Sequence, residues 1–233
     1  QEMPLAVAIP KTEQDLKILI QFARENKTSI IPRTAGTSLA GQVVGNGIIV
    51  DVSKHFTKIL EINAKEKWVR VQPGVIRDDL NRQLETYGLF FGPETSTANR
   101  CMIGGMVGNN SCGTHSPLYG TTRDHTLEIE AILADGTDVT FKALNQKEFN
   151  AKCEGESMEN DLYRHIRNTL TSQENQDEIR KEFPKPEINR RNTGYAIDVL
   201  LESDPFTSGK EKFNFCKLLA GSEGTLAFSK EIK

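Results

Sequence analysis

The chain has 233 residues, of which 37% are hydrophobic and 26% are charged, with a formal net charge of -3. This length suffices for one large domain or two small ones, and the slightly acidic balance without a basic tract argues against a nucleic-acid partner. No apolar run approaches the roughly 20 residues that span a bilayer, and the N-terminus has no signal-peptide pattern.

The cysteines are widely spaced and form no Cys-x-x-Cys pair, which argues against zinc or iron–sulfur ligands. We expect no bound metal, and we expect reduced thiols in a cytoplasmic protein, or one attached to the inner face of the membrane, at Cys101, Cys112, Cys153 and Cys216. The chain starts on an apolar stretch at 4–10 and stops inside a predicted strand at Lys233. We therefore expect a piece of a longer protein.

The first part of the chain predicts a small α/β unit. Thr12 and Asp15 form an N-cap with a carboxylate one turn in, and apolar residues then recur at helical spacing, so a helix is expected over 13–26. Short apolar runs predict strands at 29–32, 47–51, 58–62 and 68–72.

A second unit begins near Val71. We expect a helix at 76–87 that ends at Gly88, a hairpin that turns at Asp135-Gly136, and a charged helical stretch at 159–183 with a solvated face. The expected fold class is α+β in two lobes, a small α/β lobe at 1–65 and a larger α+β lobe at 66–233.

Glycine-rich stretches punctuate both units. The strand at 29–32 runs into Pro32-Arg33-Thr34-Ala35-Gly36-Thr37-Ser38-Leu39, where backbone N–H groups and hydroxyls can hold a pyrophosphate and Arg33 can offset its charge. The loop is neither a Walker A loop nor a Gly-x-Gly-x-x-Gly fingerprint. The alternative interpretation is a surface turn rich in small residues.

Two further glycine-rich stretches support the interpretation of the first as a ligand-binding loop. Four glycines fall within residues 104–113, as is usual where a backbone lies flat against a planar ligand, and a polar loop at 93–96 precedes them. The third stretch is Gly221-Ser222-Glu223-Gly224-Thr225. The presence of three such glycine-rich stretches in one chain favours a single ligand that all three contact.

These motifs, in this order, resemble the FAD-linked oxidases of the vanillyl-alcohol oxidase/p-cresol methylhydroxylase type. Within them, the chain is most similar to the branch of D-lactate dehydrogenase, glycolate oxidase and D-2-hydroxyglutarate dehydrogenase. The resemblance covers essentially the whole chain and includes Tyr119-Gly120, Asn192-Thr193-Gly194-Tyr195 and Gly221–Leu226. It implies a two-lobed domain with FAD between the lobes.

The resemblance also implies which residues bind FAD. The pyrophosphate is expected on the loop that includes Pro32, Arg33, Ala35, Gly36, Thr37, Ser38 and Leu39. The flavin or its ribityl chain is expected beside Gln42, Pro93, Glu94, Thr95 and Ser96. The remaining expected contacts are Gly104, Gly105, Asn109, Gly113, Tyr119, Gly120, Glu223 and Gly224.

Some relatives attach the flavin through a histidine in the first loop, where this chain has Thr37 and Ser38, so non-covalent FAD is expected. Cys112 is either a second tether or a small buried thiol. His115 either stabilises reduced flavin or is structural. Tyr195 and Asn192 either face the flavin or belong to the core.

The implied activity of the intact protein is oxidation of a 2-hydroxy acid such as D-lactate, glycolate or 2-hydroxyglutarate, with hydride transfer to flavin N5. The cap domain that supplies the general base and most substrate contacts is expected outside this chain, as is an iron–sulfur region of the fused subgroup. No catalytic residue is therefore assigned, and little turnover is expected of the chain alone. The alternatives are an FAD-dependent enolpyruvyl-sugar reductase and a non-catalytic nucleotide-binding module.

Overall fold

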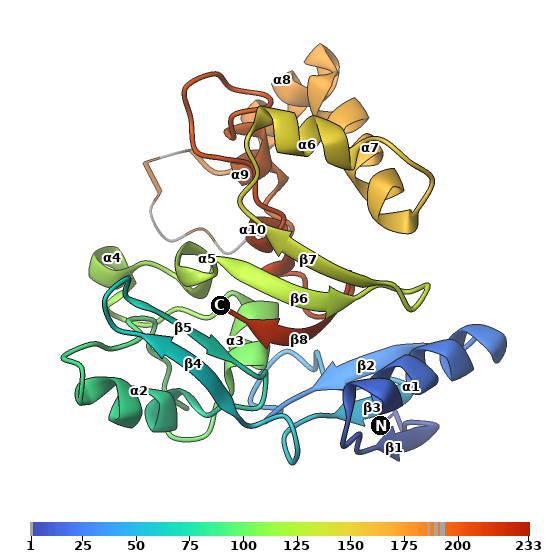
Figure 1. Ribbon diagram of the computed structural model, residues 1–233, viewed down its shortest axis with the longest axis vertical. Helices are drawn as coiled ribbons and strands as arrows, with labels where there is room; N and C mark the ends of the chain where they lie inside the picture. Colours follow the sequence, from blue (N-terminus) through green and yellow to red (C-terminus); the bar gives the residue numbers. More distant parts are fainter. Residues whose placement is uncertain (1, 186, 189–190, 192–193) are drawn as a thin grey trace.

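The computed structural model describes residues 2–185, 187–188, 191 and 194–233. It contains two sheets that lie next to each other and a helical layer beyond the second sheet (Figure 1). The α+β class expected from the sequence is confirmed. None of the helices in the described residues is long and apolar enough to cross a bilayer.

The first sheet is parallel, with strand order β1-β3-β2. Its elements are β1 (Ala6–Ala8), α1 (Glu13–Glu25), β2 (Ile30–Arg33) and β3 (Ile48–Asp51). The expected helix start is confirmed, because the Thr12 side chain accepts the Asp15 N–H and the Asp15 carboxylate accepts the Thr12 N–H. Leu16 and Ile20 of α1 pack in one core cluster with Ile48 and Val50 of the sheet.

The second sheet is antiparallel, with strand order β4-β5-β8-β6-β7. Its strands are β4 (Ile59–Asn63), β5 (Trp68–Val71), β6 (Glu128–Ile132), β7 (Asp138–Lys142) and β8 (Phe228–Ile232). The expected hairpin around Asp135-Gly136 is confirmed by the pairing of β6 with β7. The strand expected within the first lobe at 58–62 is β4, and it pairs with β5 in the second sheet instead. The division of the chain at residue 65 itself stays a prediction.

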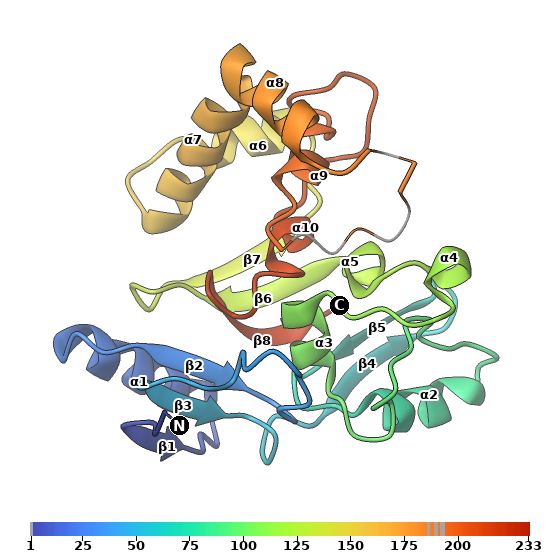
Figure 2. The same ribbon diagram turned by 180° about the vertical axis from the view of Figure 1, so that it is seen from behind.

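Four helices lie between β5 and β6 in the sequence. They are α2 (Arg77–Glu85), α3 (Ile103–Asn109), α4 (Ser116–Tyr119) and α5 (Thr122–His125). Leu80 and Leu84 of α2 are buried in one core cluster with Val107 of α3 and Val71 of β5. Figure 2, seen from behind, shows α3 near the middle of the molecule, between the two sheets.

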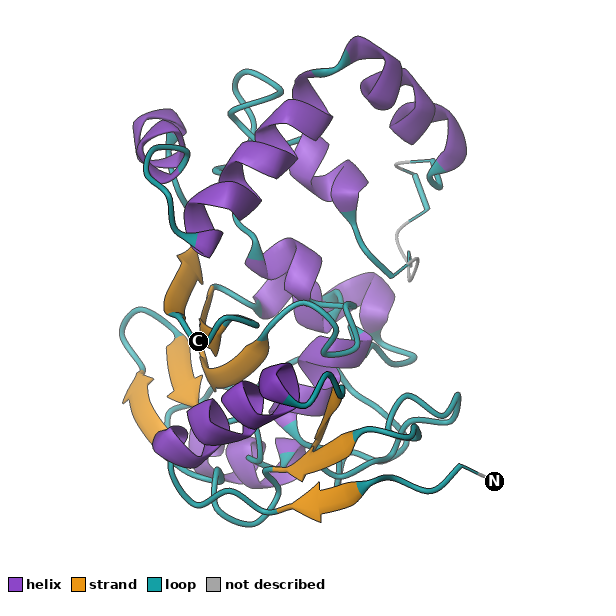
Figure 3. Cartoon of the chain, turned by 90° about the vertical axis from the view of Figure 1, so that its right-hand side faces the viewer, coloured by secondary structure: helices purple, strands orange, loops and turns teal. Residues whose placement is uncertain are grey.

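The helical layer holds α6 (Gln146–Lys152), α7 (Met158–Thr171), α8 (Gln173–Glu182), α9 (Ile197–Leu201) and α10 (Cys216–Leu219). Figure 3 shows α6–α9 gathered at one end of the molecule. The single charged stretch expected at 159–183 is two helices, because the chain breaks at Ser172, whose side chain caps α8. The stretch is also not merely a solvated face: Tyr163, Ile166 and Leu170 are buried.

Tyr163 yields a stability prediction. Its ring is fully buried against Phe215, at 4.7 Å between centroids, and its hydroxyl has no hydrogen-bond partner among the described residues. Burial raises the pKa of this hydroxyl. Because Tyr163→Phe removes an unsatisfied polar atom and keeps the ring, we expect the free energy of unfolding to stay constant or rise by up to about 1 kcal/mol. Urea unfolding measures this.

Tyr163→Leu is the comparison, because it removes the hydroxyl together with the whole aromatic ring. We expect it to lower the free energy of unfolding by about 2 kcal/mol through the loss of packing. A clear loss of stability in Tyr163→Phe would contradict the assignment of an unsatisfied hydroxyl.

Candidate functional site

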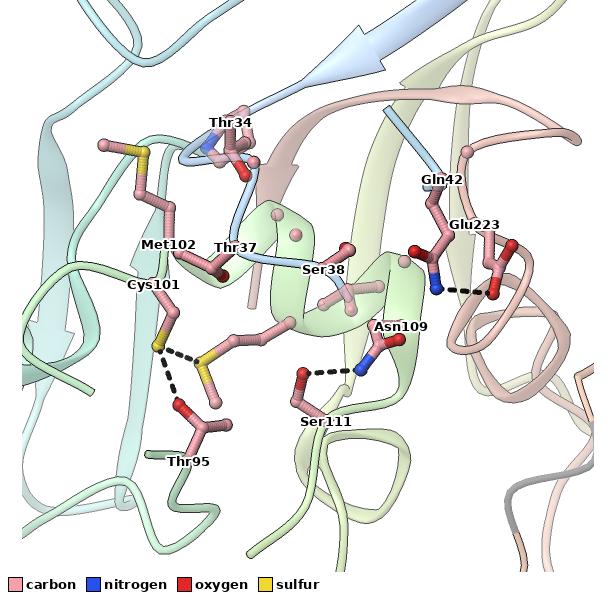
Figure 4. A pocket seen from close by; sticks show the side chains of 18 of the residues that line it. Thr34, Thr37, Ser38, Gln42, Thr95, Cys101, Met102, Asn109, Ser111 and Glu223 are labelled. Carbon is pink, nitrogen blue, oxygen red and sulfur yellow. Dashed lines mark hydrogen bonds between the residues drawn. The ribbon is translucent and has the colours of Figure 1, made fainter. Parts of the chain in front are cut away.

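A cavity of about 830 Å³ lies where the two sheets and α3 meet. Four segments supply most of its lining: the end of β2 with the loop after it, residues 94–97, residues 101–115 with α3, and residues 219–229. Val52 and Pro73 complete the lining. Figure 4 shows Thr37 and Ser38 crossing next to α3, with Gln42 and Glu223 facing each other on one side. Glycine-rich stretches that are far apart in the sequence therefore share one cavity.

The loop after β2 forms the first wall. Arg33 lies beneath this loop, since its Nε is 3.0 Å from the position that a Cβ on Gly36 would take. This Nε is inaccessible and has no hydrogen-bond partner in the described part of the chain. A buried donor without an acceptor is costly, so the first wall presents an unused cationic donor beside the cavity.

The second wall is the start of α3 together with residues 111–115. Gly104 packs directly on Pro73, and Gly113 packs on the backbone carbonyl of Glu94. A Cβ on Gly104 would lie 2.4 Å from Pro73 Cβ, and a Cβ on Gly113 would lie 2.1 Å from Glu94 O. The second wall thus depends on bare backbone, which fixes how close the neighbouring loops come.

The third wall is the turn at 221–224, which is fastened to the end of α3. Gly221 N donates to Val107 O at 2.9 Å and Glu223 N donates to Gly108 O at 2.8 Å. Gln42 Nε2 also donates to Glu223 Oε1 at 3.3 Å, which joins the first wall to the third. Gln42 Oε1 is buried without a partner in the described residues.

Polar and sulfur groups mark the rest of the lining. His115 Nδ1 lies 2.6 Å from Glu94 Oε2, and both side chains are exposed at more than a third of their area. The Cys101 thiol contacts Thr95 Oγ1 at 3.3 Å and Met106 Sδ at 3.6 Å. Within the described residues, no three His, Cys, Asp or Glu side chains are grouped as metal ligands would be.

Most of the residues predicted to bind the cofactor line this cavity. They are Pro32, Arg33, Gly36, Thr37, Ser38, Leu39, Gln42, Glu94, Thr95, Ser96, Gly104, Gly105, Asn109, Gly113, Glu223 and Gly224. Their contacts with FAD stay predictions.

The other predicted residues lie outside the lining. These are Ala35, Pro93, Tyr119 and Gly120. Tyr119 packs its ring on Phe90 and its Cβ side on Gly92, which places it among the neighbouring loops. Asn192 and Thr193 lie outside the described residues, whereas the Tyr195 hydroxyl lies 2.5 Å from Thr225 Oγ1, next to the third wall.

The cavity also has lining residues that were not among the predicted FAD contacts. Thr34 and Ser222 stand inside the first and third glycine-rich stretches, and Met102 lies two residues before the predicted contact Gly104. Pro73 and Phe228 carry no such signal, because they come from a turn and a strand that only the fold brings to the cavity.

Two solved structures share the fold of this chain. Alkyldihydroxyacetonephosphate synthase has a TM-score of 0.59 at 18% identity, over 97% of this chain and 31% of that one. 6-Hydroxy-D-nicotine oxidase from Arthrobacter nicotinovorans has a TM-score of 0.53 at 23% identity, over 60% of this chain and 30% of that one. The fold is that of the p-cresol methylhydroxylase-type FAD oxidases, as the sequence predicted.

A family model described as "FAD binding domain" matches residues 4–142. The chain belongs to this family, and its cofactor is FAD. D-2-hydroxyglutarate dehydrogenase of Haemophilus influenzae is 38% identical over 237 residues, covering 100% of this chain and 22% of the relative. Glycolate oxidase subunit GlcD of Bacillus subtilis is 37% identical over 137 residues, covering 58% of this chain and 29% of the relative. The chain thus spans about a fifth of the hydroxyglutarate relative.

The cavity fits FAD on three observations. Its size lies in the range of cofactor pockets. Its first wall offers the unpaired Arg33 Nε, which suits a pyrophosphate, and its edge offers the unpaired Gln42 Oε1, which suits an N–H donor. The bare backbone at Gly105, where a Cβ would lie 2.6 Å from Thr34 Oγ1, lets the first wall lie against α3, so that both can contact one bound group.

Arg33 gives the prediction that tests the first wall. Arg33→Met keeps the bulk beneath the loop and removes the cationic donor, so we expect FAD affinity to fall about tenfold. Flavin fluorescence titration measures the change. Arg100→Met is the control, because Arg100 is exposed and lies outside the lining. Equal losses in both variants would contradict a local role for Arg33.

Proposed function

We propose that this chain is the FAD-binding part of a dehydrogenase that oxidises a 2-hydroxy acid, and that D-2-hydroxyglutarate is the substrate to test first. The observation that carries the proposal is the share of this chain that each relative matches. Relatives named D-2-hydroxyglutarate dehydrogenase match 100% of this chain. Glycolate oxidase subunit GlcD of Bacillus subtilis matches 58% of it. The shared length includes the third wall at 221–224, which lies beyond the FAD-binding family match.

The residues of this chain bind and orient rather than react. Arg33 and the loop N–H groups offset pyrophosphate charge, while the glycine-rich second wall excludes water and fixes the plane of a flat group. FAD supplies the two-electron oxidant that accepts the substrate hydride. We propose non-covalent attachment, because the loop after β2 carries Thr37 and Ser38 and no histidine.

The proposal leaves the general base unassigned within this chain. Among the described lining residues, His115 pairs through Nδ1 with Glu94, and with its side chain 62% exposed it is assigned no role as a base. We propose that a cap domain outside this chain supplies the base and the substrate contacts, and that the protein is cytoplasmic or attached to the inner face of the membrane. The chain alone is then expected to bind FAD and to show little turnover.

The test has two arms. In the first, the chain is titrated with FAD and the visible flavin bands are recorded, and a complete lack of binding would contradict the cofactor assignment. In the second, bound flavin in the full-length protein is reduced anaerobically with D-2-hydroxyglutarate, D-lactate or glycolate, with L-2-hydroxyglutarate as control. Reduction by NADPH instead of a hydroxy acid would favour the enolpyruvyl-sugar reductase class, and rapid turnover by the chain alone would contradict the cap-domain assignment.

A further inference from the structure

Arg123 is a buried cation whose side chain meets backbone carbonyls instead of a carboxylate. It lies in α5 with 6% of its surface exposed. Its Nε donates to Lys217 O at 2.8 Å and to Ala220 O at 3.2 Å, and its Nη2 donates to Ala220 O at 2.7 Å and to Gly194 O at 3.0 Å. Burial lowers the pKa of Arg123, and the neighbouring Asp124 counteracts this only in part.

The carbonyls that Arg123 holds belong to the chain leading into the third wall. Ala220 lies between Leu219 and Ser222, both of which line the cavity. The arginine also fills the space under the turn, because a Cβ on Gly221 would lie 2.8 Å from Arg123 Nη2. The guanidinium group of Arg123 therefore supports the turn through Ala220 and the space below Gly221, in addition to the hydrogen bonds that the turn makes with α3.

The same residue is tied to the end of α3. Its backbone N–H donates to Asn110 Oδ1 at 2.8 Å, and Asn110 ends α3 in a left-handed conformation with φ 47°. Asn110 stands between Asn109 and Ser111, which line the cavity. Arg123 thus joins three separate segments: the end of α3, the approach to the turn at 221–224, and Gly194.

We propose that Arg123 is a positioning residue for the FAD site, which sets the distance between α3 and the turn at 221–224. Arg123 does not line the cavity. Its guanidinium group donates to several backbone carbonyl groups at once, which requires a forked side chain with several N–H donors. A lysine keeps the charge but offers a single nitrogen. The inference rests on the assignment of FAD to this cavity.

The test compares Arg123→Lys, Arg123→Met and Arg123→Ala with Arg70→Met. Arg70 is the control, because it is an arginine that is largely buried like Arg123. Its guanidinium group pairs with carboxylates of the second sheet, on Glu128, Glu130 and Glu231, and not with the carbonyls that lead into the turn. We expect FAD affinity to fall about tenfold or more in all three Arg123 variants and to stay within about twofold in Arg70→Met. Guanidinium ion, added well below denaturing concentrations, is expected to restore affinity in Arg123→Ala.

A second readout does not depend on FAD. Hydrogen exchange at the amides of Gly221 and Glu223, which donate to α3 carbonyls, is expected to accelerate about tenfold or more in folded Arg123→Lys and to stay unchanged in Arg70→Met. Wild-type exchange in Arg123→Lys, or equal effects in Arg70→Met, would overturn the proposal. A failure of the wild-type chain to bind FAD would instead contradict the cofactor assignment, and the exchange result would still decide the role of Arg123.

Discussion

Replacing Gly113 with alanine is expected to lower the free energy of unfolding by about 3 kcal/mol and to weaken FAD binding roughly a hundredfold. The added Cβ would lie 2.1 Å from Glu94 O and 2.8 Å from Glu94 C. Both atoms are backbone, so no side chain can turn aside, and the loop at 94–97 must separate from residues 111–115. Because both segments line the cavity, this separation displaces the second wall and changes the shape of the cavity.

Gly104→Ala is expected to act in the same direction for the same reason, since its Cβ would lie 2.4 Å from Pro73 Cβ and 3.0 Å from Pro73 Cα. Gly108→Ala is the matched control within α3, because its nearest neighbour would be Glu223 Cα at 3.7 Å, an ordinary contact. As a helical Gly→Ala change, it is expected to stabilise the apo chain by up to about 1 kcal/mol.

Urea unfolding of the apo chain and flavin fluorescence titration measure these effects separately. If Gly113→Ala and Gly108→Ala had equal stability, the close packing of the second wall would be contradicted. Loss of FAD binding in Gly108→Ala with unchanged stability would instead indicate that a bound group approaches α3 at Gly108.

The second large effect is expected where α1 meets the second sheet. Lys230 of β8 is 8% exposed in its side chain, and its Nζ lies 2.8 Å from Glu13 Oε2 and 2.9 Å from Asp138 Oδ1. Glu13 and Lys17 belong to α1, which packs on the first sheet, and Lys17 pairs with the same Asp138. Since Phe228 and Ser229 of β8 line the cavity, this ion cluster joins the strand that forms part of one cavity wall to α1.

Lys230→Met leaves two carboxylates without their shared cation, and we expect a loss of about 2 kcal/mol in the free energy of unfolding. This loss is smaller than the loss expected on breaking a fully buried ion pair, because the side chains of Glu13 and Asp138 are nearly half exposed. Lys17→Met is the control: Lys17 is 35% exposed, and we expect a loss of about 0.5 kcal/mol. A smaller loss for Lys230→Met than for Lys17→Met would contradict this ranking.

The same cluster predicts a pH dependence. Burial alone lowers the pKa of Lys230, but hydrogen bonds to Glu13 and Asp138 outweigh it, so the pKa lies above its usual value. Burial alone raises the pKa of Asp138, but hydrogen bonds from Lys17 and Lys230 outweigh it, so the pKa lies below its usual value.

The contribution of Lys230 to the free energy of unfolding is therefore fully present at pH values below the pKa of Lys230 in the unfolded chain, near 10.4. It is lost as the pH rises through the pKa of Lys230 in the folded protein. Stability from Asp138 is present above its unfolded pKa, near 3.9, and is lost as the pH falls through the folded value. Unfolding free energies measured across the pH range are expected to show a flatter alkaline limb in Lys230→Met than in wild type. An unchanged alkaline limb would contradict the role of Lys230.

What the sequence by itself determined is local. The helix start at Thr12, the turn at Asp135-Gly136 and most of the lining loops follow from rules that act over a few residues, such as capping, turn chemistry and glycine-rich spacing. The family resemblance then joined those loops into one FAD site, which neither periodicity nor composition could have done.

What only the tertiary structure decided is long-range. The last strand, β8, lies in the middle of the second sheet between β5 and β6, and β4 pairs with β5 although the sequence grouped it with the first lobe. Likewise, Lys230 meets Glu13, and Arg123 meets Ala220, across separations that carry no local signal. These contacts are fixed by which buried surfaces fit together, and that fit is a property of the whole packed chain rather than of any segment within it.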